Sequence, residues 1–134
     1  MQTLTTSKAT YRQKLTLQIL EDQLIPDIGT VRNSKDAALA AFLFWDLDNI
    51  KVIEQAYALY LNRASEPISW AEISSGASNS CLVDIKIVMS HALLSHASSF
   101  VLFHNHPSGK LTPSNADLKL TKTLQEMGKL MQIH

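Results

Sequence analysis

Two histidines, a serine and an aspartate that could take part in metal chemistry fall within one short stretch, HNHPSGKLTPSNAD, residues 104–117. In a β-strand, alternate side chains lie on one face, so His104 and His106 are expected on the same face with Cα atoms about 6.6 Å apart. Pro107 and Gly109 follow at once and predict that the strand ends there. Both imidazoles can therefore reach one ion at a strand end, where a pocket can open.

A third ligand is expected from the helix that follows. Ser114 is a natural N-cap, and Asp117 then falls in the first helical turn. The intervening loop can fold this helix start back onto His104 and His106. Two imidazoles and one carboxylate leave a fourth tetrahedral position for water, which is the pattern of a catalytic zinc site. Zinc would lower the pKa of that water toward about 7.

The same residues also have a purely structural interpretation. Ser114 with Asp117 is close to a capping box, which stabilises a helix start without any ligand. Histidines at strand ends often bond only to the backbone. The occurrence of both features in one stretch, with a loop of suitable length between them, favours the metal site.

The elements that must position these residues can be read along the chain. Apolar spacing predicts a helix with Ser34 as its N-cap, a second helix beginning near Asp84, and a last one ending near Gly128. Two runs rich in β-branched and aromatic residues, 54–63 and 66–76, predict a hairpin, and 99–106 predicts a short strand. One α/β domain with a mixed sheet and flanking helices is the simplest arrangement. Residues 1–29 are expected to form an extension with an edge strand and a loop, and residues 30–134 the domain.

Composition excludes several classes of protein. Twelve Lys and Arg balance twelve Asp and Glu among 134 residues, which argues against a strongly electropositive face for nucleic acid. The single cysteine, Cys81, rules out a disulfide framework within the chain and a multi-cysteine zinc knuckle. No stretch approaches the roughly 18 apolar residues of a membrane span, and the N-terminus has no apolar signal core. We therefore expect a soluble, cytoplasmic protein with no membrane partner.

The spacing of His104, His106, Ser114 and Asp117 resembles the motif of the JAMM (MPN+) metalloproteases. HNHPSG followed by TPSNAD is more specific and is similar to the RadC branch of that superfamily. Further matches are EQAYALYLNR, ISSG, LVDIKIV and ALLSHASSFVLFHNHPSG. The resemblance covers roughly residues 30–134. It implies a JAMM/MPN-like fold with the layering of cytidine deaminases.

The resemblance also implies roles for individual residues. His104, His106 and Asp117 match the zinc ligands, and Ser114 matches the serine that stabilises a tetrahedral oxyanion. JAMM enzymes use an upstream glutamate as general base, for which this chain offers Glu54, Glu66 and Glu72. Alignment of EQAYALYLNR with the RadC-like pattern selects Glu54. An aromatic residue is expected two positions later, where this chain has Ala56.

The leading hypothesis is therefore a zinc metallopeptidase that cleaves a peptide or isopeptide bond in a peptide or protein substrate. The alternative is a DNA-repair or mobile-element accessory protein whose metal site is structural or vestigial. RadC-like chains usually continue past the last helix into another strand, whereas this sequence stops at MQIH. An uncovered sheet edge is expected there, and either a second copy covers it in a homodimer or the chain has been cut short. The helix-hairpin-helix segment of larger RadC proteins is also absent, so DNA-associated partners lack an obvious binding element.

Overall fold

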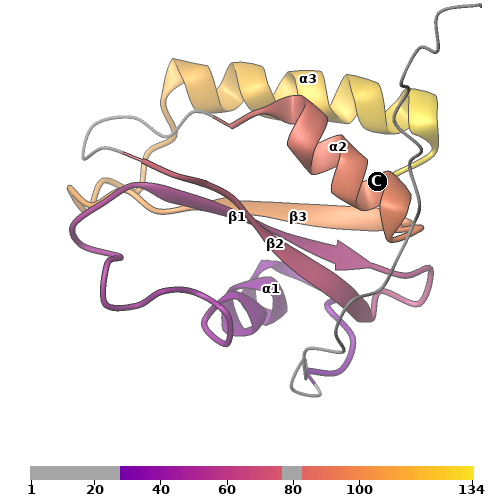
Figure 1. The fold of residues 1–134 in the computed structure, drawn as a ribbon, viewed down its shortest axis with the longest axis horizontal. Coiled ribbons are helices and arrows are strands. Elements are labelled where there is room, and N and C mark those ends of the chain that lie inside the picture. Colours follow the sequence, from indigo (N-terminus) through magenta and orange to yellow (C-terminus); the bar gives the residue numbers. More distant parts are fainter. Residues whose placement is uncertain (1–27, 77–82) are drawn as a thin grey trace, which may run out of the picture.

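The computed structural model describes residues 28–76 and 83–134 (Figure 1). The predicted strand in the N-terminal extension and Cys81 lie outside these residues, and the predicted domain boundary near residue 30 stays a prediction. The described residues form three helices and three strands. In chain order these are α1 Ser34–Ala41, β1 Gln55–Leu61, β2 Pro67–Ser75, α2 Ile85–Leu94, β3 Ser99–His104 and α3 Asn115–Met131.

The three strands form one sheet in the order β2-β1-β3, with helices on both faces. Figure 1 shows α2 and α3 over one face and α1 over the other. The predicted hairpin, the short strand and the α/β single-domain fold class are confirmed. Both strand pairs are antiparallel, so the prediction of a mixed sheet is wrong for these three strands.

The central strand β1 is buried along its whole length, because helices cover both of its faces. Its side chains alternate between two cores. Ala58 and Tyr60 belong to the cluster that includes Val88 of α2 and Leu124 of α3. Leu59 instead packs into the cluster on the α1 side. The alternation of strand side chains thus fixes which residues of β1 share a face with α3.

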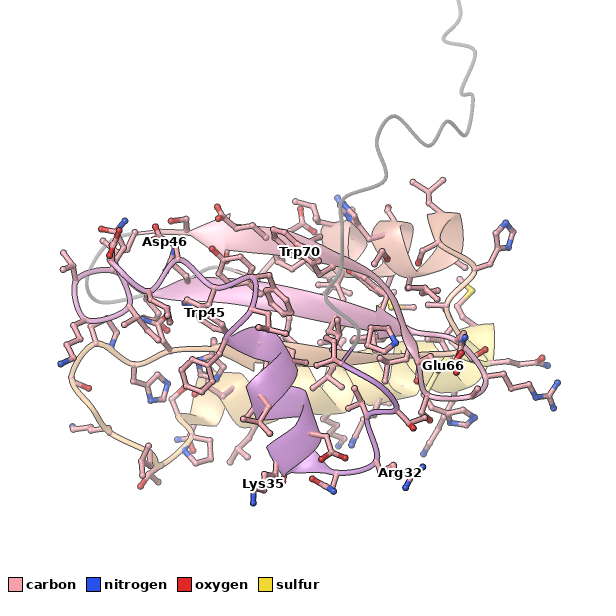
Figure 2. All side chains as sticks on the ribbon, turned by 90° about the horizontal axis from the view of Figure 1, so that it is seen from below. Arg32, Lys35, Trp45, Asp46, Glu66 and Trp70 are labelled. Atoms are coloured by element: carbon pink, nitrogen blue, oxygen red, sulfur yellow. The ribbon has the colours of Figure 1, made fainter. Side chains whose placement is uncertain are left out.

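Aromatic side chains close the α1 side of the sheet (Figure 2). Phe44 stacks on Trp70 of β2 with ring centroids 5.0 Å apart. Trp45 lies against Tyr57 of β1, with centroids 4.6 Å apart. These residues follow α1 directly, so they anchor the start of the connection that leads to β1.

All three described helices begin with a side-chain cap, and two of these caps lie where the sequence predicts a helix to begin. Asp84 caps α2, and Ser114 caps α3 in a reciprocal capping box with Asp117. The cap of α1 was misplaced by one residue. Asn33 is the N-cap, because its side chain accepts hydrogen bonds from the N–H groups of Lys35 and Asp36, and Ser34 is the first helical residue.

The end of α3 also differs from the prediction. The helix passes through Gly128 and ends at Met131, followed by Gln132 in the left-handed conformation with φ 56°. The chain then folds back, and the N–H of Ile133 donates to the carbonyl of Gly128 at 2.8 Å. Gly128 is therefore a point of close approach between chain segments rather than the helix terminator.

This close approach predicts that Gly128→Ala destabilises the protein, although the substitution usually stabilises a helix. Helix propensity alone would make alanine about 1 kcal/mol more stable than glycine. A Cβ at position 128 would instead collide with the backbone carbonyl oxygen of Ile133. We expect the variant to lower the free energy of unfolding by about 1–3 kcal/mol, measured by urea denaturation. Gln125→Ala, at an exposed position of the same helix, is the control and should change little. A gain in stability would show that the fold-back is not tightly packed.

The last residues pair with the edge of β3 that faces away from β1. The N–H of His134 donates to the carbonyl of Ser98 at 3.0 Å, and the N–H of Phe100 donates to the carbonyl of His134 at 2.8 Å. His134 thus bonds through its N–H and its carbonyl to two residues of the neighbouring segment that are two positions apart, which is the hydrogen-bond pattern of parallel strands. A strand continuing in this direction would therefore be parallel to β3 after the α3 crossover, and the sheet would become mixed.

This pairing predicts that a fourth strand would stabilise the domain. The N–H of Asn105 donates to the carbonyl of Gln55, so odd-numbered residues in this part of the chain direct their backbone groups toward β1. The backbone groups of even-numbered residues of β3, such as Leu102, point to the opposite edge, where the added strand would pair. We expect a family-like strand appended after His134 to raise the melting temperature and protect the Leu102 amide from hydrogen exchange. A Gly/Ser extension of equal length is the control. If neither extension changes the melting temperature, sedimentation of the unextended protein should show the homodimer that is predicted to cover this edge. A monomer whose melting temperature does not rise with the added strand would contradict both the fourth-strand and the homodimer predictions.

Candidate metal centre

The register of the sheet brings Glu54 toward both histidines. Ala56 of β1 lies opposite His104 of β3. Because the strands are antiparallel, the residue two positions before Ala56 lies level with the residue two positions after His104. Glu54 therefore comes to the level of His106, and both lie on the face of Ala56 and His104. The Oε1 atom of Glu54 lies 4.0 Å from Nδ1 of His104. Ala56, opposite His104, is fully buried.

Glu54, His104 and His106 form a group that can hold a metal ion. Each residue offers one ligand atom, and these atoms all lie within 4.8 Å of one another. β3 ends at His104, two residues before the predicted strand end, and His106 lies just beyond the strand. The two imidazole rings nevertheless face the same region, with ring centroids 4.7 Å apart.

Asp117 lies between the two histidines. Its Oδ1 atom is 3.5 Å from Nε2 of His104, and its Oδ2 atom is 3.7 Å from Nε2 of His106. Ligand atoms at about 2.1 Å from a tetrahedral zinc ion are about 3.4 Å apart. Each contact is therefore close to the spacing in a zinc coordination shell, but the two contacts use different oxygen atoms of Asp117, and the group whose ligand atoms all lie within 4.8 Å of one another comprises Glu54, His104 and His106. The structure brings Glu54, Asp117 and both histidines together.

The capping box of α3 orients the Asp117 carboxylate. The N–H of Ser114 donates to Oδ2 of Asp117 at 2.6 Å, and the N–H of Asp117 donates to Oγ of Ser114 at 3.2 Å. Burial acts to raise the pKa of Asp117, but hydrogen bonds from Ser114 and the charges of His104 and His106 outweigh it and lower the pKa below its ordinary value. Asp117 is thus ionised and aimed at the histidines. The structural and the metal-site interpretations of Ser114 and Asp117 are compatible.

The loop after β3 holds His106 in one orientation. His106 Nδ1 lies 2.7 Å from the carbonyl oxygen of Lys110. Pro107 and Gly109 shape this loop, in which the N–H of Gly109 donates to the carbonyl of His106 at 2.8 Å and Gly109 takes a φ of 76°. A proton on Nδ1 leaves Nε2, the atom that faces Asp117, free to bind a metal. The Pro/Gly-rich loop therefore selects the ligand atom of His106.

The other two glutamates considered from the sequence lie elsewhere. Glu66 accepts a hydrogen bond from the Asn62 side chain in the β1–β2 turn. Glu72 accepts one from the hydroxyl of Tyr57 on the α1 side of the sheet. Of the three candidates, the structure places Glu54 beside the histidines.

Sequence reasoning missed Asn105, the residue between the two histidines. Its side chain makes three hydrogen bonds to the segment that ends in Glu54 and enters β1. The signal in the sequence is weak, because strand alternation places Asn105 on the face opposite to His104 and His106 and does not identify its partners.

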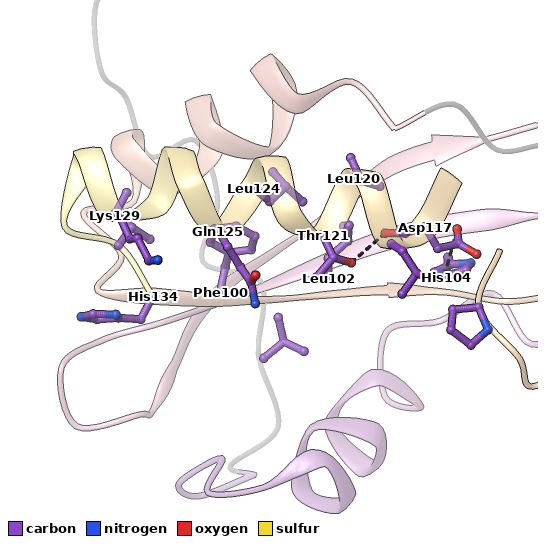
Figure 3. A pocket seen from close by; sticks show the side chains of 14 residues that line it. Phe100, Leu102, His104, Asp117, Leu120, Thr121, Leu124, Gln125, Lys129 and His134 are labelled. Atoms are coloured by element: carbon purple, nitrogen blue, oxygen red, sulfur yellow. Dashed lines mark hydrogen bonds and ion pairs between the residues drawn. The ribbon is translucent and has the colours of Figure 1, made fainter. Parts of the chain in front are cut away.

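A groove leads from the metal centre along β3 and α3 (Figure 3). It has a volume of about 680 Å³ and includes His104 and Asp117 among its lining residues. Apolar side chains line much of the remainder: Phe100, Leu102, Leu118, Leu120, Leu124 and Ile133. His104 and Asp117 are thus accessible from a surface that also offers apolar contacts.

Across residues 28–76 and 83–134, no helix has both the length and the apolar character needed to cross a membrane.

Comparisons with known proteins identify the family. The model of the RadC-like JAB domain matches residues 32–134. A UPF0758 protein of Clostridium perfringens is 33% identical over 111 residues, covering 81% of this chain and 48% of the relative. A UPF0758 protein of Finegoldia magna is 43% identical over 81 residues, covering 60% of this chain and 36% of the relative. The chain spans between about a third and a half of the length of such relatives. The RadC-like resemblance is confirmed, and the chain belongs to the RadC-like JAB domain family.

Proposed function

We propose that this protein is a zinc-dependent hydrolase of the JAMM type that cleaves a peptide or isopeptide bond in a peptide or protein substrate. The observation that carries this proposal is the meeting of Glu54, His104 and His106 within 4.8 Å. Asp117 adds a second carboxylate in contact with both imidazoles. Two imidazoles and two carboxylates suffice for three zinc ligands and one general base.

His104, His106 and Asp117 would hold the zinc ion, which supplies carbonyl polarisation and a more acidic water when bound. Glu54 takes a proton from the attacking water and returns it to the leaving amine. The Ser114 hydroxyl accepts a hydrogen bond from the N–H of Asp117, and its own O–H, which in the free site contributes a hydrogen bond to the Asp117 carboxylate, turns to donate toward the developing oxyanion. The three roles, zinc binding, proton transfer and oxyanion stabilisation, use residues from three separate segments, which the sheet register and the α3 cap align.

The exposure of the site favours catalysis over a structural role. Structural zinc sites are usually closed by four protein ligands, whereas catalytic sites keep one position open. The side chains of His104 and His106 are 27% and 22% exposed, and that of Asp117 is 21% exposed. A substrate can therefore approach the ligands, which an accessory protein with a structural metal would not require.

The test is cleavage of a complex peptide mixture and of isopeptide-linked dipeptides by zinc-loaded protein. The hydrolysis products, new amino termini from peptide bonds and free lysine side-chain amines from isopeptide bonds, are detected by mass spectrometry. They should appear with zinc and disappear after chelation, and zinc addition should restore them. A protein that binds zinc stoichiometrically but cleaves neither bond type in these substrates would contradict the proposal and favour a structural site.

A further inference from the structure

The side chain of Asn105 ties the end of β3 to the segment before β1. Its Nδ2 atom donates to the carbonyls of Ile50 at 2.6 Å and Ile53 at 2.8 Å. Its Oδ1 atom accepts from the N–H of Gln55 at 2.6 Å. These groups lie 50 or more positions away in the sequence, so local structure alone does not bring them together.

The location of these bonds couples them to the metal centre. Asn105 stands between His104 and His106, and its amide bonds bracket Glu54 from both sides, at Ile53 and at Gln55. The backbone N–H of Asn105 also donates to the carbonyl of Gln55 at 3.3 Å. The peptide units on both sides of Glu54 are thus fixed to the residue that separates the two histidines.

We propose that Asn105 is a positioning residue that holds Glu54 against the two histidines. This inference rests on the proposed function, because it assigns Asn105 an effect on Glu54 acting as a base. Only an amide suits the position. Aspartate could accept from the N–H of Gln55, but it would place a carboxylate against the two carbonyls and supply no donor. Alanine would remove all three side-chain bonds.

The first test compares Asn105→Ala and Asn105→Asp with a matched control, Asn62→Ala. Asn62 also makes three side-chain hydrogen bonds, but in the β1–β2 turn at the other end of β1. Both Asn105 variants should keep zinc affinity within about tenfold and lose about 100-fold in turnover. Asn62→Ala should lower the melting temperature and keep turnover. Equal turnover in the Asn62 and Asn105 variants would overturn the proposal.

A double-mutant cycle with Glu54→Gln separates positioning from general loss of structure. If Asn105 acts through Glu54, adding Asn105→Ala to Glu54→Gln should cost less than about threefold further turnover, whereas independent effects would multiply. Multiplied losses would overturn the inference. Asn105→Asp, which keeps one bond, gives a second cycle if the alanine variant folds poorly.

The visible absorption of cobalt-substituted protein repeats this cycle without substrate. Glu54→Gln should alter the cobalt spectrum of the wild type, and should alter it much less in the Asn105→Ala background. If the spectra behave in this way but the protein cleaves none of the test substrates, the proposed function is refuted and the positioning role of Asn105 is retained. A spectrum that responds equally to Glu54→Gln in both backgrounds, or in neither, would refute the positioning role.

Discussion

Glu54→Gln is expected to retain zinc and to lose about 10²- to 10⁴-fold in hydrolytic turnover. The amide preserves the size of the side chain but cannot accept a proton from the attacking water. We assign this role to Glu54 because its Oε1 atom is 4.0 Å from Nδ1 of His104 and its carboxylate lies within 4.8 Å of a ring nitrogen of His106. Zinc content by elemental analysis and initial rates on the cleaved substrate measure the two effects separately.

The same experiment distinguishes two roles for Glu54. Its proximity to both imidazoles also suits a metal ligand, and removal of a ligand would lower zinc content together with turnover. Retained zinc with lost turnover identifies the base. Glu66→Gln and Glu72→Gln are matched controls, because these carboxylates bond to Asn62 and Tyr57 away from the histidines. Loss of turnover in either control, or full turnover in Glu54→Gln, would contradict the assignment.

The sequence predicts the elements of this fold well where periodicity and caps agree. Asp84 and Ser114 carry the cap chemistry in their types and positions, and both begin helices as expected. Asn33 and Ser34 are both good caps in adjacent positions, so residue type alone could not choose between them. Gly128 looks like a helix end because glycine often terminates helices. Its actual role depends on Ile133 returning over it, which is a tertiary contact.

The candidate site divides in the same way. The local motif places His104, His106 and Asp117 together because strand end, loop and helix cap are all encoded within one stretch. The approach of Glu54 to His104 depends on the register between β1 and β3, two strands far apart in the sequence, and periodicity cannot define that register. Asn105 is harder still to recognise, since its partners are backbone groups and leave no pattern in the sequence.

His106→Ala is expected to reduce bound zinc from about one ion per chain to a small fraction. The variant removes the Nε2 atom that faces Asp117 and that the Lys110 carbonyl orients. Loss of a direct ligand should weaken zinc binding by more than the roughly 100-fold typical of losing a supporting hydrogen bond. Zinc at 100 times its dissociation constant should stabilise the wild type by about 2.7 kcal/mol, so the zinc-dependent rise in melting temperature should also vanish.

His91→Ala is the matched control for this experiment. His91 is an exposed histidine of α2 whose Nδ1 atom lies 2.9 Å from the carbonyl of Ile87, within its own helix. If zinc binds nonspecifically to surface histidines, both variants should lose similar amounts. If it binds at the proposed centre, only His106→Ala should lose the ion and the accompanying thermal stabilisation. Unchanged zinc content in His106→Ala would remove the metal centre and, with it, the basis for assigning Glu54 a catalytic role.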